Sequence, residues 1–195
     1  MEKLIMLGTG HAMTLDCYNT CFILQNNQGE GILVDTGGGL QIIKQLRDAN
    51  IDFRKIHNII LSHKHTDHIL GIFWIIRYIQ KFIANNTYEG NLNIYMHSEL
   101  EKTVRKIVFE VLPEKFTSLI DNRIIFADIF KPYEKMHSTV KTASQIAQSL
   151  NVENLLLYHG SDNNIENRKK SYISEAKEYF TGNIFVPDDL DIIEL

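Results

Sequence analysis

Three histidines and an aspartate lie within six residues of the chain, in the segment LSHKHTDHILG that begins at Leu61. His63 and His65 are two positions apart, so their side chains point the same way on an extended segment. Their neutral imidazole nitrogens suit zinc and neighbouring transition metals, and Asp67 and His68 add a carboxylate oxygen and another nitrogen. Calcium would instead require oxygen ligands. A solvated polar loop is the alternative, but so many ligand side chains directly after an apolar run favour a metal site.

Two further polar residues follow apolar runs that predict strands. Asp35 ends the run ILVD, where its carboxylate could orient a metal ligand from behind it or cap the helix that follows, and the two roles are compatible. His159 ends the run LLLYH. Taken alone, His159 could be a metal ligand or an ordinary surface histidine. Together with the first cluster, the pattern favours a metal ligand. Residues just past a strand lie at the rim of a sheet, so we expect both to approach the cluster.

The remaining patterns predict the elements that position these residues. Turn residues between two apolar runs predict a β-hairpin over residues 19–37. Ser98 and Glu101 form a capping box at the start of a helix over 98–112, with His97 before it on the surface. Ser138 or Thr139 caps another helix. Hairpin strands followed by alternating helices and strands predict an α/β or layered α+β architecture, in a single domain over 1–195.

Composition excludes several classes of protein. The chain has 195 residues, of which 44% are hydrophobic and 23% charged, and a net charge of −4, so no global basic field attracts nucleic acid or a membrane. No apolar run is long enough to span a membrane and no targeting segment is visible, which predicts a cytoplasmic protein.

Cys17 and Cys21 are expected to be buried free thiols, with a disulfide as the alternative. The strongly apolar segment after His68 predicts a homodimer.

The cluster and its surroundings resemble the metallo-β-lactamase superfamily. The H-x-H-x-D-H motif of that superfamily is matched by His63, His65, Asp67 and His68. Asp35 matches the strand-end aspartate before the motif, and Gly8–Gly10 match an early glycine turn. The segment HSTVKTASQIAQSLNVENLLLYH is similar to the ribonuclease Z-like branch, with His137 and His159 on its two histidines. The resemblance implies an αβ/βα sandwich.

The resemblance also implies a chemistry. Two metal ions, usually zinc with manganese as an alternative, would share a hydroxide that attacks a phosphodiester. His63 and His65 would bind one ion, and Asp67, His68 and His159 the other. Asp67 would also orient the attacking water, and His137 would contact the phosphate or protonate the leaving oxygen. The substrate would be RNA, with transfer RNA 3′-end processing as the branch's activity, or a small phosphodiester.

The chain departs from the family in its second half. A block of strands is missing near 126–130, and with it a third-motif histidine and an aspartate that bridges both metals. His97 and Asp128 are the available substitutes, and neither is favoured. An internal deletion, a site completed by another chain or an omitted segment would each explain the gap. One zinc instead of two is therefore an alternative, as are a degenerate metal-binding module without turnover and a hydrolase of non-nucleic esters, thioesters or lactones.

Overall fold

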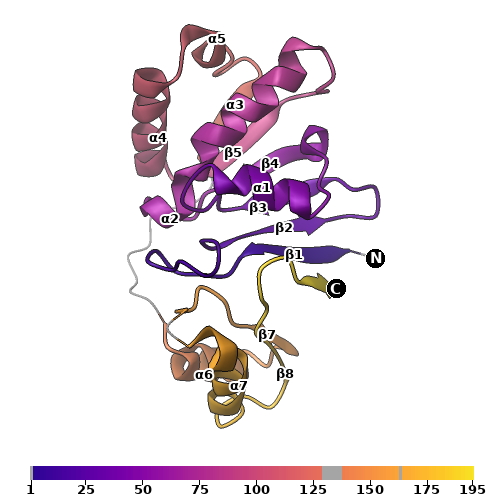
Figure 1. Ribbon diagram of the computed structural model, residues 1–195, viewed down its shortest axis with the longest axis vertical. Coiled ribbons are helices and arrows are strands. Elements are labelled where there is room, and N and C mark those ends of the chain that lie inside the picture. The colour runs from indigo at the N-terminus through magenta and orange to yellow at the C-terminus, as the bar shows by residue number, and fades with distance from the viewer. Residues whose placement is uncertain (1, 129–137, 163) are drawn as a thin grey trace.

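A computed structural model describes residues 2–128, 138–162 and 164–195. Its main feature is a seven-stranded sheet with the order β6-β5-β4-β3-β2-β1-β9 (Figure 1). The strands are β1 (Lys3–Gly8), β2 (Cys21–Gln25), β3 (Gly31–Val34), β4 (Ile56–Ile60), β5 (Leu92–Met96), β6 (Ile124–Asp128) and β9 (Ile192–Glu194). β3 to β6 run parallel, whereas β9, β1, β2 and β3 pair antiparallel. The β2–β3 hairpin agrees with the sequence prediction.

Helices cover one face of this sheet, where the main core forms. They are α1 (Gln41–Asp48), the 3-10 helix η1 (Phe53–Lys55), α2 (Thr66–Ile69), α3 (Gly71–Ala84), α4 (Ser98–Val111) and α5 (Glu114–Thr117). Alternate strand residues such as Ile23, Leu33 and Ile59 are fully buried beneath them, in one cluster with Leu46 and Ile76. Because β3 and β4 pair in parallel, the loops at their carboxyl ends lie together at one rim of the sheet.

A smaller unit lies beyond β1 (Figure 1, orange to yellow). It consists of α6 (Val140–Ser149), β7 (Asn154–Leu156), α7 (Ile165–Ala176) and β8 (Asn183–Phe185), with β7 and β8 in a parallel two-stranded sheet. Its hydrophobic core is small, with Leu157, Ala176 and Val186 buried at its centre. The layered α/β architecture is confirmed, and Thr139 caps α6 through a hydrogen bond from Thr142 N, as predicted.

Two expectations about the start of α4 need correction, and the structure gives the burial of α3. The N-cap of α4 is His97, which is 8% exposed and accepts a hydrogen bond from Leu100 N through Nδ1. A surface position for His97 and a capping box begun by Ser98 are therefore wrong, because an imidazole nitrogen fills the role expected of the serine hydroxyl. In α3 the apolar side chains are mostly buried within the chain, although Trp74 is 39% exposed. Burial within the chain accounts for most of the apolar residues of this helix, and the homodimer stays a prediction.

The predictions about the two cysteines and about membrane-spanning helices can also be compared with the structure. Cys17 and Cys21 are both free thiols, but only Cys21 is fully buried. Within the described ranges, no helix is both long and apolar enough to cross a membrane.

Candidate metal centre

The imidazole of His68 is held in one orientation by a buried carboxylate. His68 lies in the short helix α2 and is 3% exposed, and its Nδ1 is 2.7 Å from Oδ2 of Asp35. A carboxylate accepts hydrogen bonds, so Nδ1–H of His68 donates to Asp35. The Nε2 lone pair of His68 is then free to face a metal ion, which is the arrangement typical of metal-binding histidines.

Asp35 is itself fixed by Ser62, the residue before the histidine cluster. Its carboxylate accepts hydrogen bonds from Ser62 N at 2.8 Å and from Ser62 Oγ at 2.7 Å. Its backbone is left-handed, with φ of 56°. Asp35 does not cap α1, because the N-cap is Leu40 and no side chain binds there. The sequence analysis did not predict this role of Ser62. The one signal for it in the sequence is its position directly before the histidine motif.

His159 is brought to the same point by a backbone bridge between the two units. Gly160 N donates to Thr9 O at 2.9 Å, and His11 N donates to Gly160 O at 3.1 Å. His159 also has a left-handed backbone, with φ of 65°. Left-handed conformations of residues other than glycine cost free energy and persist where the surroundings impose them. The loop after β7 is thus held against the loop after β1, with the imidazole directed at His68.

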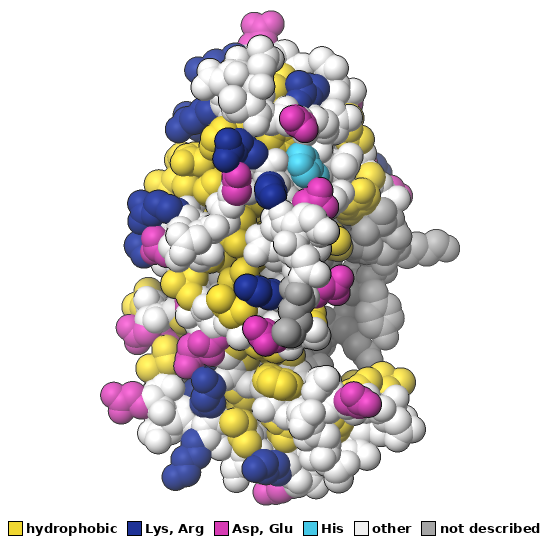
Figure 2. Space-filling view, turned by 90° about the vertical axis from the view of Figure 1, so that its right-hand side faces the viewer, with side chains coloured by type: hydrophobic (Ala, Val, Ile, Leu, Met, Phe, Trp, Pro, Cys, Tyr) yellow, Lys and Arg dark blue, Asp and Glu magenta, His cyan; other side chains and the backbone are white. Residues whose placement is uncertain are grey.

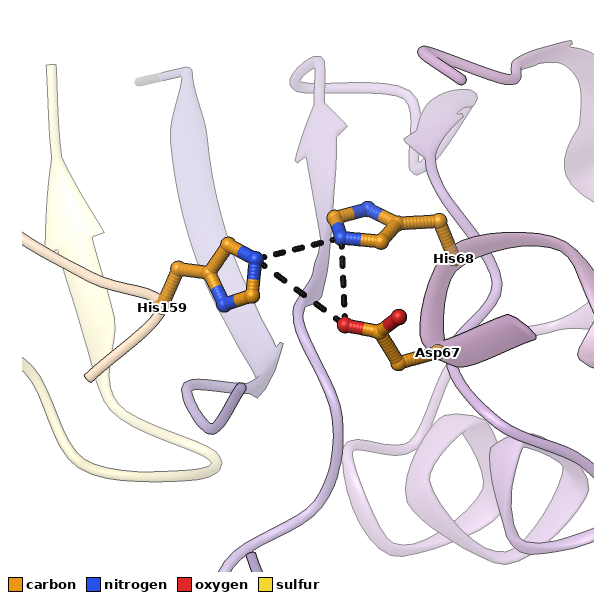
Figure 3. A group of neighbouring side chains, drawn as sticks. All are labelled: Asp67, His68 and His159. Atoms are coloured by element: carbon orange, nitrogen blue, oxygen red, sulfur yellow. Dashed lines mark hydrogen bonds and ion pairs between the residues drawn. The ribbon is translucent and has the colours of Figure 1, made fainter. Parts of the chain in front are cut away.

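Asp67, His68 and His159 converge on one point (Figure 3). His68 Nε2 lies 3.2 Å from His159 Nε2 and 3.3 Å from Asp67 Oδ2, and the third separation, His159 Nε2 to Asp67 Oδ2, is 3.9 Å. Ligand atoms about 2.0–2.1 Å from a tetrahedral zinc ion are roughly 3.3 Å apart. The three donors therefore fit a zinc-sized cation with a fourth position for water or substrate, and two nitrogens with one oxygen suit zinc or manganese.

His63 and His65 lie beside this group and contact each other. His63 Nε2 is 3.0 Å from His65 Nδ1, and the His63 ring centroid is 4.0 Å from that of His68. Burial, and secondly the neighbouring His68, lower the pKa of the His63 imidazole, which keeps it neutral and able to coordinate. The two histidines could hold a second cation next to the first. Among the described residues, the groups of three or more donors contain only Asp67, His68 and His159.

Helix α2 is locked to the loop that follows β3. Thr36 donates twice to His68 O, through its backbone N and through Oγ1, both at 2.8 Å, and Gly71 N donates to Gly37 O at 3.0 Å. A Cβ at Gly71 would lie 1.9 Å from Thr36 O, so only glycine permits this approach. The glycine-rich loop therefore sets the position of the helix that carries Asp67 and His68.

A cavity of about 400 Å³ lies beside the glycine-rich loop that follows β3. It is lined by the loop after β1, including Tyr18 and Asn19, and by Gly38 and Gly39. Gly38 lies near the backbone of Asp67, since a Cβ at Gly38 would lie 4.0 Å from the Cα of Asp67. The cavity falls within the ordinary size range of small-molecule sites, about 300–1,000 Å³.

An aspartate that the sequence analysis missed shapes this cavity. Asp189 accepts hydrogen bonds from Thr9 N at 2.8 Å, Thr9 Oγ1 at 2.7 Å and Tyr18 N at 2.5 Å. It lies in the acidic segment PDDLD, which looks like a solvated turn in the sequence. It fixes both ends of the loop after β1 and so positions one wall of the cavity.

Of the remaining candidate residues, only Asp128 and His97 are described, and both lie away from the candidate metal group. His137 falls outside the described residues. Asp128 is exposed at the end of β6. His97 is engaged as the cap of α4. Neither Asp128 nor His97 belongs to the group of metal-capable residues.

Comparison with known proteins gives a consistent family. Residues 2–112 match the family model described as "Anti-Pycsar protein Apyc1". Ribonuclease Z of Methanococcus aeolicus is 28% identical over 200 residues, a match that includes 89% of this chain and 60% of that protein. Anti-Pycsar protein Apyc1 of Bacillus phage BSP38 is 35% identical over 78 residues, 40% of this chain and 29% of that protein. The chain thus spans less than two thirds of the length of these relatives.

Solved structures agree at the level of the fold. The metallo-β-lactamase fold protein YhfI of Bacillus subtilis superimposes with a TM-score of 0.74 at 15% identity, and the match covers 98% of both chains. The short form of human tRNase Z gives a TM-score of 0.60 at 13% identity, also covering 98% of both chains. This chain is therefore a ribonuclease Z-like member of the metallo-β-lactamase superfamily and belongs to the Anti-Pycsar protein Apyc1 family.

Proposed function

We propose that the chain is a metal-dependent phosphodiesterase, within the broader class of metallo-β-lactamase-type hydrolases that its relatives indicate. The observation that carries this proposal is the convergence of Asp67, His68 and His159 at tetrahedral ligand spacing. A divalent cation bound there would act as a Lewis acid and would lower the pKa of a coordinated water. His63 and His65 are the proposed ligands of a second ion.

The chain's own residues have separate tasks in this proposal. Asp35 fixes the tautomer of His68 so that its Nε2 lone pair is directed at the cation. Asp67, which is 5% exposed, holds and orients the attacking water through its carboxylate. His137, outside the described residues, is proposed to protonate the leaving oxygen or to contact the phosphate.

We favour a small phosphodiester over a large RNA as the substrate. The net charge is −4, and on the face drawn in Figure 2 Lys and Arg side chains alternate with Asp and Glu. Gripping a polyanion over many nucleotides requires a concentration of basic side chains. The cavity beside Gly38 suits a substrate of nucleotide size. Ribonuclease Z relatives make RNA the second substrate to test.

The test is hydrolysis of bis(p-nitrophenyl) phosphate and of a transfer RNA precursor with a 3′ trailer. Protein loaded with zinc or manganese should cleave the small ester, and a chelator should abolish the activity. Asp67→Asn and His68→Ala should lower the rate at least about a hundredfold, since general-base and metal contributions are of this size. His57→Ala, at a half-buried histidine on β4 that contacts Tyr88, is the matched control. Undiminished activity in metal-free protein would refute the proposal.

A metal-binding module without turnover is the second candidate. It is favoured by the three-member donor group, because a hydroxide shared between two ions needs two complete sites. Elemental analysis decides between them: two ions per chain support the phosphodiesterase, whereas one ion without hydrolysis of either substrate supports the module. Hydrolysis of a lactone or thioester in place of both phosphodiesters would point to another reaction of the same fold.

A further inference from the structure

A buried arginine joins the smaller unit to the rest of the chain. Arg168 lies on α7 within the run NRKK, and it is 5% exposed, whereas Lys169 and Lys170 beside it are exposed. A guanidinium carries a permanent charge, and burying it costs free energy unless its donors find acceptors. The proposed hydrolysis gives Arg168 no task, so its burial needs another explanation.

The guanidinium of Arg168 binds the loop between β1 and β2 at two points. Its Nη2 donates to Oγ1 of Thr9 at 3.2 Å, and its Nη1 lies 3.8 Å from Sγ of Cys17. Thr9 is 1% exposed, and its hydroxyl donates its proton to Asp189 at 2.7 Å, so the lone pair on its oxygen is available to Arg168. A planar guanidinium holds two such acceptors in one fixed geometry, which a lysine ammonium does not.

The aliphatic part of the same side chain packs against the residue that follows His159. A Cβ at Gly160 would lie 3.2 Å from Cδ of Arg168. Gly160 N in turn donates to Thr9 O at 2.9 Å. Arg168 therefore contacts both partners of the backbone bridge that directs His159 at His68 (Figure 3).

The ion pair of Arg168 does not explain its burial. Its carboxylate partner, Asp188, lies 3.2 Å from Nη2, but the side chain of Asp188 is 58% exposed. Asp188 also binds Lys169, at 3.3 Å, on the surface of the helix. An exposed carboxylate shared between two cations contributes little to stability. The contacts with Thr9 and Gly160 are therefore the ones that distinguish Arg168 from its neighbour Lys169.

We propose that Arg168 is a positioning residue for the candidate metal centre. It holds the loop after β7 against the loop after β1, and through Gly160 it fixes the distance of His159 from Asp67 and His68. This inference rests on the proposed function, in which those three ligand residues bind a cation. Loss of a group that orients a ligand from behind typically weakens metal binding 10- to 100-fold, so the smaller unit would set the metal affinity of the centre.

The test is the zinc affinity of two matched variants, titrated against a chromophoric chelator. Arg168→Met removes the guanidinium but keeps an unbranched stem that packs against Gly160, and it should weaken zinc binding about tenfold. Lys169→Met is the control, because Lys169 binds the same Asp188 from the exposed side. The zinc affinity of this control should stay within about twofold of wild type. Both titrations are repeated in the His159→Ala background.

The His159→Ala background separates positioning from general destabilisation. If Arg168 acts through His159, Arg168→Met loses its effect on zinc binding once the imidazole is gone. An Arg168→Met affinity equal to wild type, or a loss of the same size in both backgrounds, would overturn the inference and leave the proposed function standing. Circular dichroism shows whether Arg168→Met folds. If it does not, Arg168→Lys, which keeps the charge but not the planar fork, takes its place with the same expected results.

A wild type that binds no zinc would instead refute the proposed function. The position of His159 is then read in metal-free protein from its imidazole signals in nuclear magnetic resonance spectra. Arg168→Met should shift the His159 signals, and Lys169→Met should leave them in place. Unshifted His159 signals in Arg168→Met would overturn the positioning role as well.

Discussion

Asp35→Asn removes one charge and tests how the centre is oriented. In the structure, Oδ2 of Asp35 lies 2.7 Å from both His68 Nδ1 and Ser62 Oγ, and Oδ1 accepts from Ser62 N. An asparagine can keep its oxygen toward Ser62 N and place its amide nitrogen where Oδ2 stood. That nitrogen donates to His68 Nδ1, so the imidazole proton moves to Nε2, the atom that faces the candidate metal.

The expected effect is on metal affinity. Loss of a carboxylate behind a metal-binding histidine typically weakens binding 10- to 100-fold, or roughly 1.4–2.8 kcal/mol. The measurement is a zinc titration against a chromophoric chelator at pH 7.5, with thermal unfolding of the metal-free protein alongside it. Asp162→Asn is the control, because Asp162 accepts hydrogen bonds from Leu15 N and Asp16 N in an exposed loop. The zinc affinity of this variant should stay within about twofold of wild type. If Asp35→Asn binds zinc as tightly as wild type while remaining folded, the assigned tautomer is wrong.

Three other predictions concern packing, thiol chemistry and linkage. Gly71→Ala should destabilise the fold by about 1–3 kcal/mol in urea unfolding, since its Cβ would meet Thr36 O at 1.9 Å; an unchanged midpoint would contradict the close approach. Cys21 is fully buried, and burial, followed by the charges of Asp35 and Asp189, raises the pKa of its thiol, so Ellman's reagent should titrate Cys17 alone in native protein and both thiols in denaturant. Free zinc at a hundred times its dissociation constant should stabilise the folded state by about 2.7 kcal/mol in a calorimetric scan, and a chelator should reverse the shift; no shift would mean that zinc does not bind the native state.

The parts of the fold that were predicted correctly depend on local patterns. The β2–β3 hairpin follows from two apolar runs around a turn, and the Thr139 cap from a hydroxyl residue before an amphipathic helix. The convergence of His68 and His159 could not come from local rules, since they are 91 positions apart. It was expected only because strand ends meet at a sheet rim and because the resemblance named both residues.

The features that were missed depend on contacts that residue type and local pattern do not reveal. His97 was placed on the surface because a lone polar residue usually lies there, yet a local hydrogen bond to Leu100 N makes its burial acceptable. The apolar period of α3 does not say whether its sides are covered by the same chain or by a partner, so the homodimer stays a prediction. Ser62 and Asp189 act through bonds to residues distant in sequence, so no window of sequence around either one contains the partners.

The left-handed backbones of Asp35 and His159 have a consequence for how this centre receives its occupant. The free-energy cost of each unfavourable backbone torsion is met when the protein folds, before a metal ion binds. The hydrogen-bond network around each residue offsets this cost. A metal ion that binds here then meets side chains that already point at the site, so binding requires no change of backbone conformation at these two residues. Rigidity at these two points should therefore appear as fast capture with little heat-capacity change.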